Sequence, residues 1–196
     1  MTVHNTKEDI RNSFIELYKT NKISSITVDM ICKNAFISRS TFYKFYKNIE
    51  NVEKEIEDDI INLIIRIREE TSYQDIFSLA PETPAPALVA MTRFLLENKD
   101  YFTAAFSDHG SPTFNQRYRN LNLEFMNTFA TENHVPEEMR EVAANIVCDA
   151  LLAMQRNVLK YHQYFDEIGI SLGFKNMIIS LTSKIRDNCI LPEKKS

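Results

Sequence analysis

The segment from Ile26 to Val52 constrains the fold of this chain more than any other part of the sequence. Its apolar residues recur at helical spacing in two short runs, and the runs begin at Thr27 and at Ser38. A threonine or serine at that position can accept a hydrogen bond from the free backbone amides of a first helical turn. The periodic pattern breaks between residues 34 and 37, so the segment predicts two short helices joined by a tight turn. The expected apolar side of the pair consists of Val28, Ile31, Cys32, Phe42, Phe45 and Tyr46.

Helical periodicity also dominates the rest of the chain, and alternating strand patterns are nearly absent, which predicts an all-α fold. A first helix is expected over about 6–20, where Thr6 and Asp9 approximate a capping box. Residues 71–86 are expected to be irregular. Further helices are expected from about 48 to beyond 67, near 88–95, near 101–106, from 112 to about 129, over 137–161 and over 167–190. We expect a three-helix head with a helix-turn-helix in residues 1–47 and a larger helical body in residues 48–196.

Positive charge is concentrated near the N-terminus. Residues 1–47 hold eight Lys or Arg against four acids, whereas the remaining residues hold 15 against 23. A basic head on an acidic body is typical of a DNA-binding module joined to a domain with a different partner, although chance asymmetry is an alternative. The overall net charge of −4 argues against a protein that coats nucleic acid without selectivity.

Catalytic, metal and membrane chemistry find little support in the sequence. It contains no nucleophile–base pair, phosphate loop, cofactor motif or zinc-like spacing, so we expect no enzyme, no cofactor and no metal site. The sequence contains no run of about 18 apolar residues, so we expect no membrane span. The N-terminus lacks an apolar signal segment. Three distant cysteines, Cys32, Cys148 and Cys189, indicate reduced thiols in a cytoplasmic protein. They are expected to be small core residues rather than redox sensors.

The second short helix of the Ile26–Val52 segment has a positive, hydroxyl-rich side that suits the DNA major groove. Arg39 is the best candidate for reading a base, because a guanidinium can grip O6 and N7 of guanine together. Lys44 and Lys47 would attract phosphates, which strengthens binding but reads little sequence. The alternative is an ordinary solvated helix face. The expected DNA-binding residues are Thr27, Ser38, Arg39, Ser40, Thr41, Tyr43, Lys44 and Lys47.

These residues resemble the N-terminal signature of the TetR family of bacterial repressors. The resemblance implies that the Tyr43 hydroxyl meets a phosphate. Three departures stand out: Phe36 replaces a turn glycine, Ser40 replaces another common glycine, and Ile49 replaces a phosphate-binding lysine. Because positive φ is costly for phenylalanine, we expect Asn34 to take the left-handed position instead. The residues that match the signature are Thr27, Val28, Ile31, Ala35, Ile37, Ser38, Thr41, Phe42, Tyr43, Tyr46, Glu50 and Val52.

The resemblance also implies a homodimer and an effector pocket in the body. An apolar band on the last two helices is the expected dimer surface, with an intrachain core as the alternative. Its residues are Val147, Ala150, Leu151, Met154, Val158, Phe174, Ile178, Leu181 and Ile185, flanked by Val142 and Ile146. The candidate pocket residues are Met91, Phe94, Phe102, Phe106, Tyr118, Leu121, Phe125 and Gln155, with Leu95 and Met126 nearby. Aromatic residues and methionines at this spacing also fit a plain core.

The sequence therefore predicts a sequence-specific DNA-binding transcriptional regulator, acting as a ligand-responsive dimeric repressor. Its expected partners are a double-stranded DNA operator, a second copy of itself and a small apolar or aromatic effector, with no membrane. The alternative is a TetR-fold adaptor that binds another protein and has little operator affinity. The departures at Phe36 and Ile49 keep this alternative open.

Overall fold

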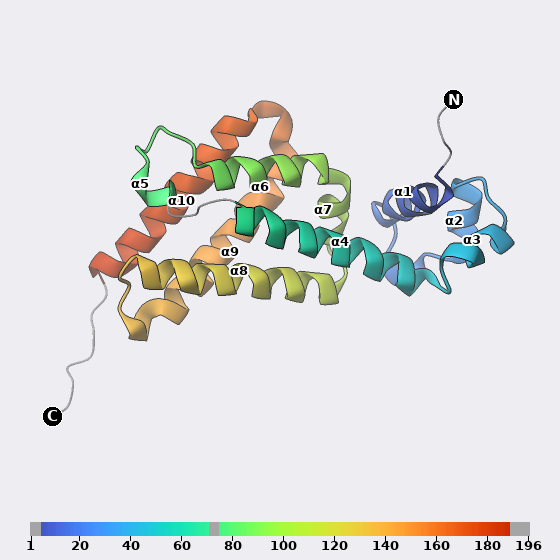
Figure 1. Ribbon diagram of the computed structural model, residues 1–196, viewed down its shortest axis with the longest axis horizontal. Helices are drawn as coiled ribbons and strands as arrows, with labels where there is room; N and C mark the ends of the chain where they lie inside the picture. The colour runs from blue at the N-terminus through green and yellow to red at the C-terminus, as the bar shows by residue number, and fades with distance from the viewer. Residues whose placement is uncertain (1–4, 71–74, 189–196) are drawn as a thin grey trace. The chain divides into compact units, whose positions relative to one another are not determined.

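The computed structural model describes residues 5–70 and 75–188, and throughout these ranges the chain is helical with short connections (Figure 1). The predicted all-α fold is confirmed. The helices in chain order are α1 (Thr6–Tyr18), the 3-10 turn η1 (Ile23–Ser25), α2 (Val28–Asn34), α3 (Arg39–Phe45), α4 (Ile49–Glu70), α5 (Asp75–Ser78), α6 (Pro86–Glu97), α7 (Lys99–Ala105), α8 (Pro112–Glu132), α9 (Glu137–Tyr161), η2 (His162–Tyr164) and α10 (Glu167–Asn188).

Three of the helix starts follow directly from hydroxyl residues in the sequence. The Thr27 side chain accepts a hydrogen bond from the Met30 backbone amide at 3.3 Å, and Ser38 accepts one from Thr41 at 3.1 Å. Ser111 caps α8 in the same way. The start of α1 differs from the expected capping box, because the N-cap is Asn5 and its side chain makes no capping hydrogen bond. Thr6 is already the first helical residue.

The turn between α2 and α3 is built on a strained phenylalanine. Phe36 has a φ of 54°, which is the left-handed region that favours glycine. Ile37 N–H donates to the Cys32 carbonyl at 3.0 Å, and this bond closes the end of α2 in the manner of a Schellman motif. The expectation that Asn34 would take the left-handed position is wrong, because Asn34 is the last residue of α2. The hydrogen bond from Ile37 to Cys32 spans six residues, and this motif requires the left-handed conformation at the residue after the C-cap, which is Phe36.

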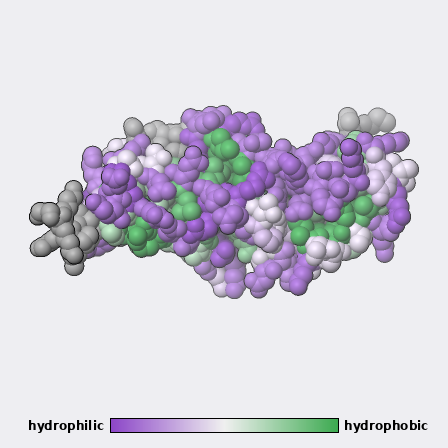
Figure 2. Space-filling view, turned by 90° about the horizontal axis from the view of Figure 1, so that it is seen from below, coloured by the Kyte–Doolittle hydropathy of each residue, from purple (hydrophilic) through white to green (hydrophobic). Residues whose placement is uncertain are grey.

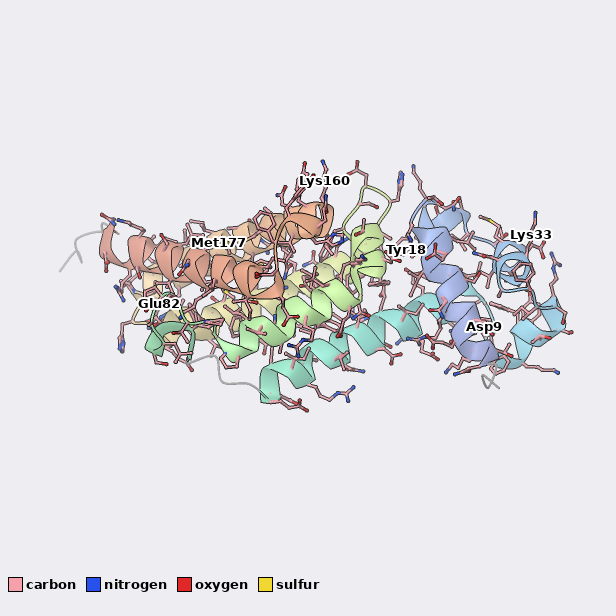
Figure 3. The ribbon with its side chains drawn as sticks, turned by 90° about the horizontal axis from the view of Figure 1, so that it is seen from above. Asp9, Tyr18, Lys33, Glu82, Lys160 and Met177 are labelled. Atoms are coloured by element: carbon pink, nitrogen blue, oxygen red, sulfur yellow. The ribbon has the colours of Figure 1, made fainter. Side chains whose placement is uncertain are left out.

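Residues up to Arg66, together with residues 97–115, form one compact unit. Its core includes Ile10, Phe14 and Phe42, each fully buried. Tyr18, labelled in Figure 3, lies near the end of α1 with its ring 6.1 Å from that of Tyr101 in α7. The Tyr18 hydroxyl accepts a hydrogen bond from the Ser111 backbone amide at 2.7 Å. This unit thus contains the described part of the predicted head together with most of α4 and all of α7.

Just before α8, Gly110 allows a close backbone approach in the same unit. A Cβ added at Gly110 would lie 1.9 Å from the Ala105 carbonyl oxygen, so no larger residue fits without moving the backbone. Asn115 then donates to the same Ala105 carbonyl at 2.8 Å. The turn from α7 to α8 is therefore tight because it lacks a side chain at one position.

The second unit comprises residues 67–96 and the chain from residue 116 onward. Here α9 and α10 pack side by side (Figure 1). Lys175 of α10 is fully buried, and its ammonium donates to the carbonyls of Leu79, Ala80 and Thr83 at 2.6–3.1 Å. These hydrogen bonds hold the segment between α5 and α6 against α10. The sequence predicted this stretch to be irregular and did not indicate the single turn of α5.

Candidate nucleic-acid interface

The proposed DNA-reading side of α3 is exposed to solvent. Arg39, Ser40, Tyr43 and Lys44 are all exposed, and Lys47 is exposed just beyond the helix. Phe42, on the opposite side, is fully buried, and Tyr46 is 4% exposed. The structure therefore separates a polar, cationic face from the apolar face as the residue spacing predicted. Phe45 departs from the prediction, because it is 44% exposed rather than packed with Phe42.

Hydroxyl groups gather at the start of α3. The Ser38 hydroxyl lies 2.8 Å from the hydroxyls of both Ser40 and Thr41, in addition to capping the helix. Short side chains at a helix N-terminus leave backbone amides accessible to a phosphate or a base edge. Thr27 occupies the equivalent position on α2. Lys33 of α2, labelled in Figure 3, is also exposed and adds positive charge next to this region.

Arg39 is engaged by an acid from α2. Its Nε and Nη2 both donate to the carboxylate of Asp29, which is a bidentate ion pair between two exposed side chains. The hydrogen bond from Arg39 lowers the pKa of the Asp29 carboxyl, and the positive charge of Arg39 acts in the same direction. Sequence reasoning did not identify Asp29, because residue spacing alone does not show which acid lies next to which base across a turn.

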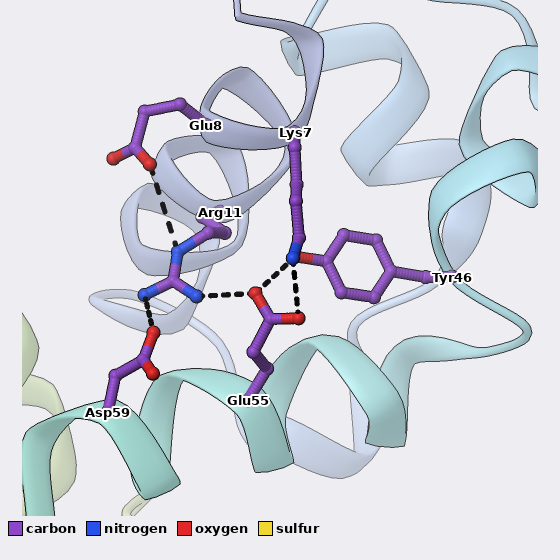
Figure 4. Close-up of polar contacts among 6 residues, drawn as sticks. All are labelled: Lys7, Glu8, Arg11, Tyr46, Glu55 and Asp59. Atoms are coloured by element: carbon purple, nitrogen blue, oxygen red, sulfur yellow. Dashed lines mark hydrogen bonds and ion pairs between the residues drawn. The ribbon is translucent and has the colours of Figure 1, made fainter. Parts of the chain in front are cut away.

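An ion-pair network fastens α3 to its neighbours in the same unit (Figure 4). Glu55 of α4 accepts hydrogen bonds from Arg11 at 2.6 Å and from the Tyr46 hydroxyl at 2.9 Å, and it pairs with Lys7 at 2.8 Å. Burial opposes ionisation of Glu55, but the bonds from Lys7, Tyr46 and Arg11 together outweigh it and lower its pKa. Arg11 also reaches Asp59 at 2.8 Å. The network links α1, the end of α3 and α4.

The second unit contains a cavity lined by five helices. It leaves about 40 Å³ for the centres of water molecules, which is small beside the several hundred Å³ of a typical ligand pocket. Of the candidate pocket residues, Met91, Phe125 and Gln155 line it, as do Leu95 and Met126. Sequence reasoning missed several residues, partly because three of them are polar. The missed residues are Arg68, Leu88, Thr92, Asn122, Leu151, Phe174 and Ile178.

Polar side chains around the cavity are connected by hydrogen bonds, with Asn122 donating to the Tyr118 carbonyl at 2.8 Å. Arg68 donates to the Leu121 carbonyl at 2.7 Å and to Asn122 at 2.8 Å, and its guanidinium lies over the Phe125 ring. Tyr118 is buried and donates to Gln155 Oε1 at 3.1 Å. Tyr118 and Leu121 are thus neighbours of the cavity without lining it.

The remaining candidate pocket residues lie elsewhere. Phe102 and Phe106 belong to the first unit, where Phe102 packs against Phe106 and Phe114 with centroids 5.5 and 6.3 Å apart. Phe94 is buried and does not line the cavity. Helical spacing placed all three on apolar faces, but it does not tell which neighbouring helix each face meets.

The candidate dimer residues divide by burial. Five of them are buried within the single chain and so belong to its core: Val147, Leu151, Val158, Phe174 and Ile178. Ala150, Met154, Leu181 and Ile185 are partly exposed and remain candidates. Val142 and Ile146 on α9 are 46% and 43% exposed.

Further apolar side chains reach the surface near the end of α9. A shallow groove there is lined by Met154, Asn157, Val158, Tyr161, Tyr164 and Phe165. Tyr164 and Phe165 are 74% and 60% exposed. On another face of the molecule, Figure 2 shows apolar patches between hydrophilic areas.

Other chemistry is limited in the part of the chain that the structure describes. Within residues 5–70 and 75–188, no group of three or more His, Cys, Asp or Glu side chains is placed to hold a metal ion. Cys32 and Cys148 are buried and free, and burial raises the pKa of both thiols. Cys189 lies outside the described residues. Among the described residues, one helical stretch, Glu137–Tyr164, is long and apolar enough to span a membrane, but a single helix of this kind is weak evidence, and 44% of its 18-residue apolar window is buried inside the protein.

Comparison with known proteins rests on structure. No protein-family model matches the sequence, and no curated protein matches it. A TetR transcriptional regulator from Streptococcus agalactiae 2603V superposes with a TM-score of 0.58 at 21% identity, covering 92% of this chain and 93% of that chain. A TetR/AcrR-family regulator from Aquifex aeolicus VF5 gives 0.56 at 22% identity, over 93% and 96%.

A third similar structure contains a ligand. FadR from Thermus thermophilus, a TetR-family transcriptional repressor in complex with lauroyl-CoA, gives a TM-score of 0.50 at 16% identity, over 97% of this chain and 98% of that chain. At these identities the likeness concerns the fold. The chain has the fold of the TetR/AcrR family of transcriptional regulators.

Proposed function

We propose that this chain is a sequence-specific DNA-binding transcriptional regulator, and that it acts as a dimeric, ligand-responsive repressor. The observation that carries the proposal is the exposed, cationic and hydroxyl-rich face of α3 within a fold shared with transcriptional regulators. A capped helix of this length, braced by a partner helix, fits the major groove. Residues 1–47 would carry the DNA contacts, and residues 48–196 would supply the surfaces for the effector and the second copy.

The DNA contacts divide into base-reading and phosphate-binding groups. Arg39 would grip a guanine, while Ser40 and Thr41 are short enough to touch base edges or a thymine methyl. Lys44, Lys47 and the Tyr43 hydroxyl would meet phosphates, which position the helix without reading sequence. Tyr43 suits this role because it is 56% exposed and its ring rests edge-on against buried Phe42.

Dimerisation would use the exposed part of α9 and α10. One α3 helix reads too few base pairs to select a site in a genome, so helix-turn-helix proteins commonly read two half-sites as dimers. Val142 and Ile146 are exposed on one side of α9, and the groove around Tyr164 and Phe165 supplies further apolar surface. A two-fold pairing of these helices would build a four-helix bundle.

An effector would occupy the cavity around Gln155. Its walls are mostly apolar, with Arg68, Thr92, Asn122 and Gln155 as the polar groups, which suits a small apolar or aromatic molecule with a polar end. The cavity must widen to admit one, and Met91 and Met126 are flexible side chains that can change shape at low cost. The complex of T. thermophilus FadR with lauroyl-CoA supports the idea that this fold can hold such a ligand.

Selection of bound fragments from random and genomic DNA by the purified full chain tests the proposal. We expect a preferred duplex with two half-sites and a dimer in solution. Arg39→Ala should reduce discrimination at one base pair by roughly tenfold or more. Lys47→Ala should weaken binding to all duplexes and lower the slope of log affinity against log salt by about one. Lys99→Ala, which removes an exposed charge from α7, is the control and should change neither quantity.

Failure to select any duplex, or a strictly monomeric chain, would contradict the proposal. An interaction protein of the same fold, with little operator affinity, would give the first of these results. We also propose that the protein works in the cytoplasm, where its operator would be.

A further inference from the structure

The ion pair between Asp29 and Arg39 joins the first turns of the two helices of the helix-turn-helix. Asp29 is the second residue of α2, and Arg39 is the first residue of α3. The Asp29 carboxylate accepts hydrogen bonds from Nε and Nη2 of Arg39, so it binds the side edge of the forked guanidinium. This geometry leaves the end of the fork, with both hydrogens of Nη1 and the second hydrogen of Nη2, directed away from the acid.

With its side edge bound to Asp29, Arg39 still offers guanine the two donors at the end of its guanidinium. Two parallel N–H donors match O6 and N7 in the major groove, and their discrimination depends on a fixed orientation. A long arginine side chain that is 65% exposed would otherwise sample many rotamers and lose entropy on binding. An acid that holds the side edge while leaving the end edge free removes part of this cost before DNA arrives.

Asp29 has an electrostatic disadvantage that a specificity role explains. It is the only acid between Thr27 and Lys47, a stretch that holds Lys33, Arg39, Lys44 and Lys47. Its side chain is 61% exposed, and next to DNA it would repel phosphates. An exposed ion pair of this kind contributes little to folding stability. A carboxylate in the first turn of α2 is favourable by itself, but that effect does not require the bidentate contact with Arg39.

We infer that Asp29 is a specificity-determining residue, which orients Arg39 so that the end of its guanidinium reads one guanine. This inference rests on the proposed function, because it concerns the same DNA-reading surface. Asp29 acts through Arg39 and is a positioning residue. Its presence lowers affinity for DNA in general and raises the preference for guanine at one position.

The inference predicts two effects of Asp29→Asn that have opposite signs: stronger binding to DNA in general and weaker preference for guanine. Asp29→Asn would be compared with wild type on the selected duplex, on the same duplex with each guanine replaced in turn, and on unrelated duplex of equal length. We expect binding to unrelated duplex to strengthen, because a negative charge is lost, and discrimination at one guanine to fall by roughly tenfold. Arg39→Ala should lose discrimination at the same position, and the double variant should be no worse there than Arg39→Ala.

A matched control separates positioning from simple charge. Glu16→Gln removes one exposed acid from α1, where Glu16 pairs with Lys19 at 3.3 Å, and changes the net charge by the same amount. It should leave guanine discrimination unchanged. The inference would be overturned if the wild-type protein selects a duplex and Asp29→Asn discriminates guanine as well as wild type or better. That result would leave the proposed function standing. If wild type itself selects no duplex, the proposed function fails first. Far-UV circular dichroism would check that each variant is folded.

Discussion

Replacing Phe36 by glycine should stabilise the protein. Phe36 holds a φ of 54° and its side chain is 95% exposed, so the residue bears a backbone penalty without gaining packing. A left-handed conformation costs an L-residue about 1–2 kcal/mol, and glycine avoids that cost. Glycine also makes the unfolded chain more flexible, which offsets about 0.4–1 kcal/mol. The expected net gain in the free energy of unfolding is therefore about 0.5–1 kcal/mol.

Urea denaturation followed by circular dichroism would measure this gain as a higher midpoint at unchanged slope. Hydrogen exchange of the α2 and α3 amides would show that the gain is local to the helix-turn-helix. Phe36→Ala is the matched control, because alanine removes the ring but keeps the Cβ that causes the strain. Its stability should stay close to that of wild type. If the glycine variant is no more stable than the alanine variant, the backbone explanation is wrong.

Three further changes test packing and charge in each unit. Gly110→Ala should lower the thermal midpoint, because its Cβ would meet the Ala105 carbonyl oxygen at 1.9 Å. Lys175→Met should reduce the free energy of unfolding by about 2–4 kcal/mol, since three partly buried carbonyls lose their donor; urea denaturation measures the loss, and an unchanged midpoint would refute it. Glu55→Gln should cost only about 1 kcal/mol, because Glu55 is one-third exposed. The pKa of Glu55 is lowered from 4.5 in the folded protein. The difference in the free energy of unfolding between variant and wild type should therefore have its full value above about pH 4.5 and disappear as the pH falls through the lowered pKa. Urea denaturation at several pH values measures this difference.

Local features of the fold were predictable because their causes lie within a few residues. Thr27, Ser38 and Ser111 cap helices through hydroxyls that reach amides three residues ahead, so the starts of α2, α3 and α8 could be read from the sequence. The turn after α2 was harder to predict. A general preference against positive φ favoured Asn34, but the hydrogen bond from Ile37 to Cys32 decides which residue takes the left-handed conformation.

The candidate sites were less predictable because they depend on contacts between distant segments. The spacing of residues indicated that Gln155 and Phe125 lie on inward faces, yet it did not show that Arg68 from α4 meets Asn122 from α8. For the same reason the pairing of Asp29 with Arg39 was missed. Polar residues carry no periodic apolar signal, so their partners emerge only when the helices are assembled.

The bond between Tyr46 and Glu55 limits how this molecule can be dissected. Tyr46 follows α3 directly, and it is buried with its hydroxyl bound to a side chain of α4. Val52 and Ile56, also on α4, are part of the same interior. A peptide cut after residue 47 would keep every proposed DNA contact but lose the helix that anchors α3. The smallest DNA-binding fragment that folds by itself should therefore extend well into α4. A series of progressively shortened chains can define its end.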